Sequence, residues 1–353
     1  MKDKHQYVAA DSELLKAIYK RVGQELVLDK NAFRWIIAIK FLVYFSIVLL
    51  TYLALYKISH PIGFVACYVA HGFILLLFAF NFSHDFSHNT IFKSKRLNHI
   101  CFVIIYALVG AHAEAWKQRH VNSHHYAPNV ENYDSDLKIT KLIRVVPGSR
   151  HHWFHQYQHL YAPFLYTSYS LFWIFIKDFV ILFCDDDTCA VKKKFGYFLS
   201  FGLQKLSYIG LLLVLPLLFT TQQWYVVLLG FLLMHLTQSL FLLFTFFMTH
   251  HVEETQYPRA NEQGYINASW LMNQVKSSND MHPFSKTANF IFGGFNNHIA
   301  HHLFPHYHHT FYPKISIILY EMLIEKGIKP NCTSYWGGIK SHLNHLKKMG
   351  AEG

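Results

Sequence analysis

Charged residues are scarce in this 353-residue sequence. Only 15% of the residues are Asp, Glu, Lys or Arg, whereas 52% are apolar and 17% are aromatic. This composition is too apolar for an ordinary soluble enzyme, while the charges near both ends argue against a pure membrane bundle. The formal charge of +11 is compatible with nucleic-acid binding, but apolar runs separate the Lys and Arg residues. We therefore expect a membrane protein with basic cytoplasmic segments and no nucleic-acid partner.

Cysteine is also rare. Its five positions, an odd number without any CxxC spacing, are 67, 101, 184, 189 and 332. This argues against an iron–sulfur or zinc–thiolate site and favours unpaired thiols in a reducing compartment. The first thirty residues carry charges throughout and lack the apolar core and cleavage site of a signal peptide. Without an internal repeat or a Pro/Gly-rich linker, residues 1–353 are predicted to form a single domain.

Four segments are long and apolar enough to cross a bilayer, which takes about 20 residues. They are roughly residues 33–56, 62–82, 195–220 and 224–248. Short turns join the first to the second and the third to the fourth, so the spans are predicted to form two hairpins. The positive-inside rule places residues 83–194, residues 249–353 and both termini in the cytoplasm. The predicted fold is therefore an all-α integral membrane protein with a cytoplasmic cap.

Two further apolar runs are interrupted by charge. Residues 98–115 contain Glu114, and residues 163–183 contain Lys177 and Asp178. Charges are costly inside hydrocarbon but cheap at its boundary. We therefore interpret both runs as helices that lie on the membrane surface rather than as spans.

Histidine is unusually common, with 26 residues, and it is clustered. Spacings of i, i+3 and i, i+4 place side chains on one helical face, as two ligands of a metal ion require. All clusters are predicted on one membrane face, because an even number of spans separates them. They offer more nitrogen atoms than one ion can use, so two metal ions are expected. The candidate ligands are His84, His88, His120, His124, His125, His298, His301 and His302, with a further ligand from the pair His250 and His251 at the end of the last span.

The remaining histidines have other interpretations. His251 is an alternative to His250 as the ligand from the last span. His306, His308 and His309 are predicted to form a surface tract, and His151, His152, His155 and His159 are predicted to be mostly surface or outer polar groups. A separate set of polar side chains is expected to surround the metal ligands and to orient them by hydrogen bonds. Its candidates are Asp85, His251, Glu253 and Asn297.

The ligand type limits the chemistry. Imidazole suits iron, copper, zinc and nickel. Zinc hydrolysis needs only about three protein ligands per ion, and it does not explain why the clusters adjoin long apolar helices. Oxidation of an unactivated C–H bond in a lipid explains both features.

Several motifs then resemble those of the membrane fatty acid desaturases, especially the bacterial linoleoyl-CoA desaturase-like group that includes front-end desaturases. They are "HDFSHNT", "HVNSHHYAP", "HQYQHLYAPFLY", "HHVEET" and "GGFNNHIAHHLFPHYHHTFYPKIS". The resemblance implies a four-span fold, two iron ions on the cytoplasmic side, and a fatty acyl substrate carried by CoA, a carrier protein or a phospholipid. It also implies that His250, rather than His251, is the ligand from the last span. Oxygen and two electrons would remove two hydrogens and leave a cis double bond. Zinc is an expected substitute for iron in preparations. His235 would be either a polar contact between helices or, with Gln238, a liner of the substrate tunnel.

The sequence departs from this family in two places. Front-end members usually carry glutamine at the first position of the third cluster, where this chain has His298. Many also contain a cytochrome-b5-type domain with an HPGG motif, whose only near match here is "HPFS" at 282–285. Electrons are therefore expected from an external donor such as a ferredoxin or a cytochrome.

Two other functions are alternatives to a desaturase. A lipid hydroxylase or ketolase, acting on a fatty acyl chain or a carotenoid, would use the same two-iron site. A metal transporter or haem-binding membrane protein would require ligands along the spans. The predicted spans contain no carboxylate, which argues against conduction of metal ions.

Overall fold

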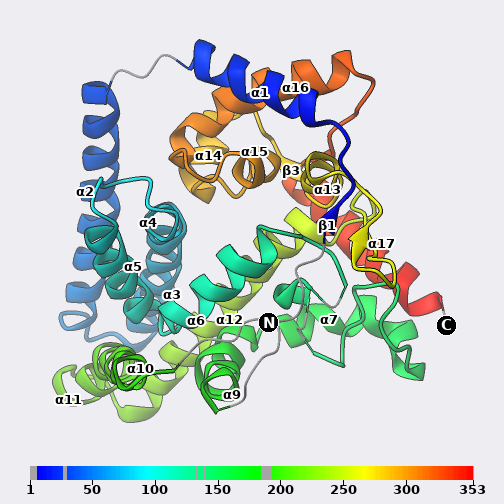
Figure 1. Ribbon diagram of the computed structural model, residues 1–353. Coiled ribbons are helices and arrows are strands. Elements are labelled where there is room, and N and C mark those ends of the chain that lie inside the picture. The colour runs from blue at the N-terminus through cyan, green and yellow to red at the C-terminus, as the bar shows by residue number, and fades with distance from the viewer. Residues whose placement is uncertain (1–5, 27–29, 132, 138–139, 184–192, 353) are drawn as a thin grey trace.

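The computed structural model is built almost wholly of helices (Figure 1). It describes residues 6–26, 30–131, 133–137, 140–183 and 193–352. The strands in this part of the chain are two residues long and pair in parallel, β1 (Gln6–Tyr7) with β2 (Tyr265–Ile266) and β3 (Asp280–Met281) with β4 (Cys332–Thr333). Pairs this short add no sheet layer, so the prediction of a helical protein is confirmed.

Four helical segments are long and apolar enough to cross a membrane: Phe33–Leu55, Pro61–Ser87, Phe195–Phe219 and Trp224–His250. The first lies within α2 (Lys30–Leu55), and the last is α12 (Trp224–His250). The second comprises α3 (Pro61–Phe78), the π-helix η1 (Ala79–Ser83) and α4 (His84–Ser87). The third comprises α10 (Phe195–Ile209), the π-helix η6 (Gly210–Val214) and α11 (Leu215–Phe219). These segments confirm the four predicted apolar helices, although the second continues beyond residue 82 into the first histidine cluster.

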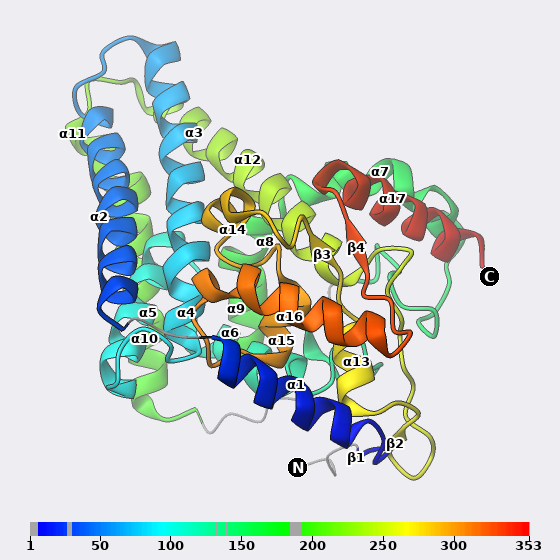
Figure 2. The same cartoon turned by 90° about the horizontal axis from the view of Figure 1, so that it is seen from above.

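The packing of these helices suits a lipid environment. Helix α3 packs against both α2 and α12 (Figure 2). The outer side of α2 is apolar and unprotected, with Trp35, Leu42 and Leu50 between 59% and 70% exposed. An apolar face of this extent is unfavourable in water and is expected where lipid covers it.

The two charge-interrupted runs form bent helix pairs. One pair is α5 (Lys95–Val109) followed by α6 (Ala113–Arg119) and the π-helix η2 (His120–His124), with a bend of 109°. The other is the 3-10 helix η4 (Trp153–Tyr157) and α7 (Gln158–Tyr166), followed by α8 (Tyr169–Phe172), the π-helix η5 (Trp173–Lys177) and α9 (Asp178–Phe183), with a bend of 75°. By length and composition alone, each pair would also be long enough for a span.

Specific contacts stabilise these bends. Gly110 ends α5 with a φ of 82°, and a Cβ there would lie 2.9 Å from side-chain atoms of Ile174 and Tyr208. Glycine is therefore required at this turn. The carboxylate of Asp178 is paired, because it accepts a hydrogen bond from Lys205 Nζ at 2.6 Å. The charge that interrupts the second run is thus neutralised by a residue of α10.

The remaining helices cover the histidine-bearing ends of α4 and α12 (Figures 1 and 2). They are α1 (Ser12–Glu25), α13 (Trp270–Lys276), α14 (Lys286–Phe292), α15 (His298–Leu303), the 3-10 helix η7 (His309–Phe311), α16 (Tyr312–Glu325) and α17 (Tyr335–Ala351). Another short 3-10 helix, η3 (Ser135–Leu137), lies between η2 and η4. Helix α16 packs on α1 and α15, and α17 packs on α7 and the end of α12. This part has an apolar core of its own, including Val22, Ile299 and Leu319, which keeps α15 in place.

Three of the five cysteines can be located. Cys67, Cys101 and Cys332 are free thiols, whereas Cys184 and Cys189 lie outside the described residues.

Candidate metal centre

Four separate segments bring histidine side chains to one place. Two histidines come from α4 and its end, three from η2 and its end, one from the last residue of α12, and three from α15. The first group is His84, His88, His120, His125 and His301, and the second group is His124, His250, His298 and His302. Within each group, one ring nitrogen from every residue lies within 4.8 Å of the others. The structure therefore brings all nine predicted histidines together, divided between two groups.

The assignment of histidines to the two groups follows the i, i+4 spacing of an α-helix in the first and third clusters, but not in the second cluster, residues 120–125. His84 and His88, and likewise His298 and His302, share a group at i, i+4 spacing. Residues 120–124 instead form a π-helix, in which the His125 amide donates to the His120 carbonyl at 3.0 Å. The wider turn assigns His120 and His125 to the first group and His124 to the second. Single π-helical turns are frequent at functional sites.

The ring nitrogens of His124 and His250, in the second group, are arranged to bind a cation. His250 Nδ1 lies 2.8 Å from the Ser277 carbonyl, which can only accept a hydrogen bond, so this nitrogen carries the proton. His124 Nδ1 likewise lies 2.9 Å from the Asp134 carboxylate. When both rings are neutral, as metal binding requires, the two Nε2 atoms carry lone pairs, and they lie 3.0 Å apart. A metal ion between such lone pairs would turn repulsion into coordination, so the second group fits a metal.

The three histidines of α15 are consistent with this interpretation. His302 Nδ1 lies 2.9 Å from Gln274 Oε1, and His301 Nδ1 lies 3.2 Å from the Tyr312 hydroxyl, so their Nε2 atoms also face inward. Burial lowers the pKa of His298, His301 and His302 well below the usual value, and neighbouring histidines lower it further. These side chains are therefore neutral, which is the form of histidine that binds metals.

The residues around the histidines differ from those predicted. Asp85 contacts His308 and His309 rather than a member of either group. His251 belongs to neither group, and its Nδ1 lies 2.9 Å from the Tyr257 hydroxyl. The backbone carbonyl of Asn297 accepts a hydrogen bond from the His301 N–H at 2.9 Å, but the side chains of the other two candidates bond elsewhere. Glu253 is exposed and accepts a hydrogen bond from Asn344, and Asn297 donates to the Pro283 carbonyl and to Ser316.

Sequence reasoning missed the residues that do orient the histidines. Asp134, Ser277, Gln274 and Tyr312 hold the outer nitrogens. No spacing rule connects them to their partners. Asp134 reaches His124 because the intervening loop turns back at Asn129, which has a φ of 58° and donates its backbone N–H to Asp134.

The predicted surface tract is partly wrong. His306 is exposed as expected, but His308 and His309 are only 2% and 0% exposed. Both rings face the buried Asp85 carboxylate, which provides a polar environment for them inside the protein. His155 is also buried, and its Nε2 lies 3.0 Å from the Lys141 carbonyl.

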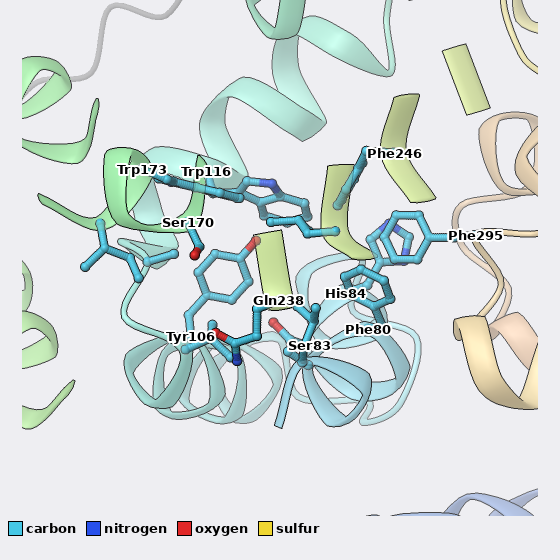
Figure 3. A pocket seen from close by; sticks show the side chains of 16 residues that line it. Phe80, Ser83, His84, Tyr106, Trp116, Ser170, Trp173, Gln238, Phe246 and Phe295 are labelled. Atoms are coloured by element: carbon cyan, nitrogen blue, oxygen red, sulfur yellow. The ribbon is translucent and has the colours of Figure 1, made fainter. Parts of the chain in front are cut away.

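An apolar cavity of about 70 Å³ adjoins the first group (Figure 3). Its lining includes His84, Trp116, Trp173, Phe246 and Gln238. Gln238 is one of the two residues that the sequence suggests as liners of a substrate tunnel. His235 is not part of the lining. Its Nδ1 lies 2.8 Å from Ser170 Oγ and its Nε2 lies 2.7 Å from the Tyr208 hydroxyl, so it forms the predicted polar contact between helices.

A second cavity, of about 80 Å³, has charged walls. It is lined by Arg119, Asp136 and Lys177 and by histidines of both groups. Trp116, Trp173 and Phe246 line both cavities, so these aromatic side chains separate an apolar space from a polar one.

Comparison with known proteins agrees with this geometry. A family model described as fatty acid desaturase matches residues 59–334. The chain is 31% identical over 289 residues to an acyl-lipid (8-3)-desaturase from Physcomitrium patens, a match that covers 79% of this chain and 59% of that relative. It is 30% identical over 327 residues to a Delta(5) fatty acid desaturase A from Dictyostelium discoideum, covering 88% and 68%. It is 27% identical over 293 residues to an sn-1 linoleoyl-lipid 6-desaturase from Arthrospira platensis, covering 79% and 76%.

Proposed function

The chain belongs to the fatty acid desaturase family, and we propose that it is a membrane enzyme that introduces a cis double bond into a long-chain fatty acyl substrate. The observation that carries this proposal is a pair of adjacent groups of buried histidines, the first of which adjoins an apolar cavity through His84. The relatives named above are all desaturases, which favours desaturation over the hydroxylase or ketolase alternative.

Two iron ions are the proposed cofactors. The first group of histidines would hold one ion and the second group the other, with His250 rather than His251 as the ligand from α12. When bound, the two ions supply the oxidising power that removes hydrogen from an unactivated C–H bond with oxygen and electrons. The histidines contribute neutral nitrogen ligands, and Asp134 and Ser277 keep the rings of His124 and His250 in the required orientation.

The substrate is proposed to lie in the apolar cavity of Figure 3, with the reacting carbons beside His84. The apolar lining excludes water and accommodates methylene groups. The substrate's polar end would occupy the charged cavity on the other side of Trp116, Trp173 and Phe246. Since two relatives are named for lipid-bound acyl chains, we propose a glycerolipid rather than CoA or a carrier protein as the carrier.

The overall reaction then balances with an external reductant. Two adjacent methylene groups lose two hydrogen atoms and become a double bond. One O2 molecule takes up these two hydrogens, two electrons and two protons, and leaves as two molecules of water. The electrons come from a donor such as a ferredoxin or a cytochrome.

The topology is part of the proposal. Four spans in two hairpins would place both termini, residues 83–194 and residues 249–353 on the cytoplasmic side, with the bent helix pairs at the membrane surface. The convergence of His84 and His120 with His301 supports this arrangement, because ligands of one centre must lie on one side of the bilayer.

The function can be tested by lipid analysis. We expect that expression in a host of known lipid composition yields a new cis double bond, located by mass spectrometry of the derivatised acyl chains. A His302→Ala variant should yield none. A hydroxylated or oxo product would favour the alternative reaction, and an unchanged lipid profile from iron-loaded protein with an available donor would contradict the proposal.

We also expect two metal ions per chain, because two groups of histidines are present. Metal content can be measured by plasma mass spectrometry before and after titration with a chelator. In the wild type both ions should leave together, over the same range of chelator concentration, since both groups consist of buried or half-buried histidines. Zinc in preparations is compatible with this expectation, because nitrogen ligands bind zinc more tightly than ferrous iron. An active enzyme with one ion or none would contradict it.

A further inference from the structure

Lys40, Asp85, His308 and His309 form a buried polar cluster outside the two histidine groups. Their exposed fractions are 4%, 1%, 2% and 0%. Lys40 comes from α2, Asp85 from α4, and the two histidines lie at the start of η7. The cluster therefore joins the first apolar span, the first ligand-bearing helix and a segment close to α15.

The contacts run in one line from Lys40 to Asp85. Lys40 Nζ lies 2.7 Å from His309 Nε2, and His309 Nδ1 contacts the Asp85 carboxylate. Since an ammonium group can only donate, His309 Nε2 accepts and Nδ1 carries the proton that is donated to Asp85. The His309 backbone N–H, 3.2 Å from Asp85 Oδ1, adds a second contact.

Hydrogen bonding, and not the binding of a third metal ion, is the role that we assign to this cluster. Asp85, His308 and His309 are close enough to hold an ion. However, the Nδ1 atom of His309 is already used as a donor, and the positive charge of Lys40 already balances the negative charge of Asp85. A further cation would lie close to the Lys40 ammonium group in a medium of low dielectric constant, which is unfavourable.

Helix α4 is the last turn of the second span. It comprises only His84–Ser87 and follows the π-helix η1. The ends of helices fray readily, so tertiary contacts are needed to fix the orientation of this turn. Asp85 directly follows His84 and lies three residues before His88, both of which belong to the first group. The contacts that hold Asp85 therefore also fix the direction of these two imidazoles.

The opposite end of the cluster is also held firmly. Asn289 donates to the His309 carbonyl at 2.9 Å, and Lys40 Nζ lies 4.6 Å from the centre of the Phe290 ring. Gly294, with a φ of 89°, allows the chain before α15 to approach His309, since a Cβ there would lie 2.5 Å from His309 Cβ.

We propose that Lys40, acting through His309 and Asp85, is a positioning residue that fixes His84 and His88 in the first metal group. The inference rests on the metal centre of the proposed function, but not on the reaction. Its effect is confined to one ion. The second group is held by Asp134, Ser277 and Gln274, none of which contacts the Lys40 cluster.

The test compares the variant Lys40→Met with the wild type and with Lys205→Met. Lys205 is a matched control, because it is 5% exposed, pairs with Asp178 at 2.6 Å and belongs to neither histidine group. Each iron-loaded protein is equilibrated with increasing chelator, and metal per chain and thermal unfolding are measured. Loss of groups that orient metal ligands typically reduces affinity about 10- to 100-fold. Lys40→Met should therefore lose one ion at a chelator concentration about 10- to 100-fold lower than the wild type requires.

The remaining ion identifies the affected group. Its spectrum should match that of His88→Ala, which disrupts the first group, and not that of His302→Ala, which disrupts the second. Lys205→Met should unfold at a lower temperature but keep both ions. The double variant Lys40→Met/Asp85→Asn should lose no more affinity than the larger of its single variants, because both interrupt the same line of contacts.

Three results would overturn the inference: wild-type affinity for both ions in Lys40→Met, equal weakening of both ions, or the same metal loss in Lys205→Met. Asp85→Asn, which preserves side-chain shape, provides the same measurement if Lys40→Met does not fold. Metal binding is measured without substrate. An inactive wild type that binds two ions would therefore contradict the proposed function while leaving this inference intact.

Discussion

Replacement of His124 or His301 with alanine is expected to abolish desaturation. The two residues belong to different groups, His301 to the first and His124 to the second. Loss of an orienting partner alone typically reduces metal affinity or activity about 10- to 100-fold, so loss of a ligand should exceed roughly 100-fold. If both ions are needed to remove the two hydrogens, either substitution is sufficient to stop the reaction.

The measurement is the amount of new double bond formed per molecule of protein, with metal content determined on the same sample. His306→Ala is the appropriate control, because His306 is exposed and lies in the same region of the chain as His301. It should retain most of the activity. Comparable losses in all three variants would mean that histidine content in general, and not the two groups, determines activity.

The choice of control shows where sequence and structure differ. In sequence, His306, His308 and His309 appear to be equivalent members of one tract. In the structure, His308 and His309 face the buried Asp85, which is 224 residues distant from His309 in the chain. A buried carboxylate requires polar partners, but composition and spacing do not indicate which distant residues provide them.

Features governed by local periodicity were predictable. Four apolar helices follow from runs of about 20 apolar residues, and the histidine pairs at i, i+4 in α4 and α15 follow from helical geometry. The π-helix at His120–His124 was not predictable, because it depends on how the chain packs rather than on residue spacing. It changes which of His120, His124 and His125 share a group.

The groups that orient the ligands were the least predictable part of the site. Glu253 lies only two residues after His251 at the end of α12, but it is exposed. Asp134, ten residues after His124, has the expected role because the loop at Asn129 folds back. Proximity in sequence was therefore a poor guide to proximity in space wherever a loop, rather than a helix, joins the two residues.

A single cysteine introduced at position 141 or 347 is expected to react with a membrane-impermeant reagent only from the cytoplasmic side, and one at position 221 only from the outside. Lys141, Lys347 and Thr221 are all exposed, so each site is accessible to the reagent. Thr221 lies between the end of α11 and the start of α12, the turn that joins the last two spans. The native cysteines must first be replaced, because Cys332 is exposed and would react as well.

The physical reason for this pattern is the reach of the ligands. Each nitrogen must approach its metal to about 2.0–2.2 Å, whereas the hydrocarbon core separates the two faces by roughly 30 Å. The first group combines His84 and His120, which precede the third span, with His301, which follows the fourth. The segments that carry them must therefore emerge on the same face, which requires an even number of crossings between them. Labelling is measured on intact cells and on inverted membrane vesicles. If positions 141 and 347 reacted from opposite sides, these histidines could not share one centre, and the proposed desaturase mechanism would have to be abandoned.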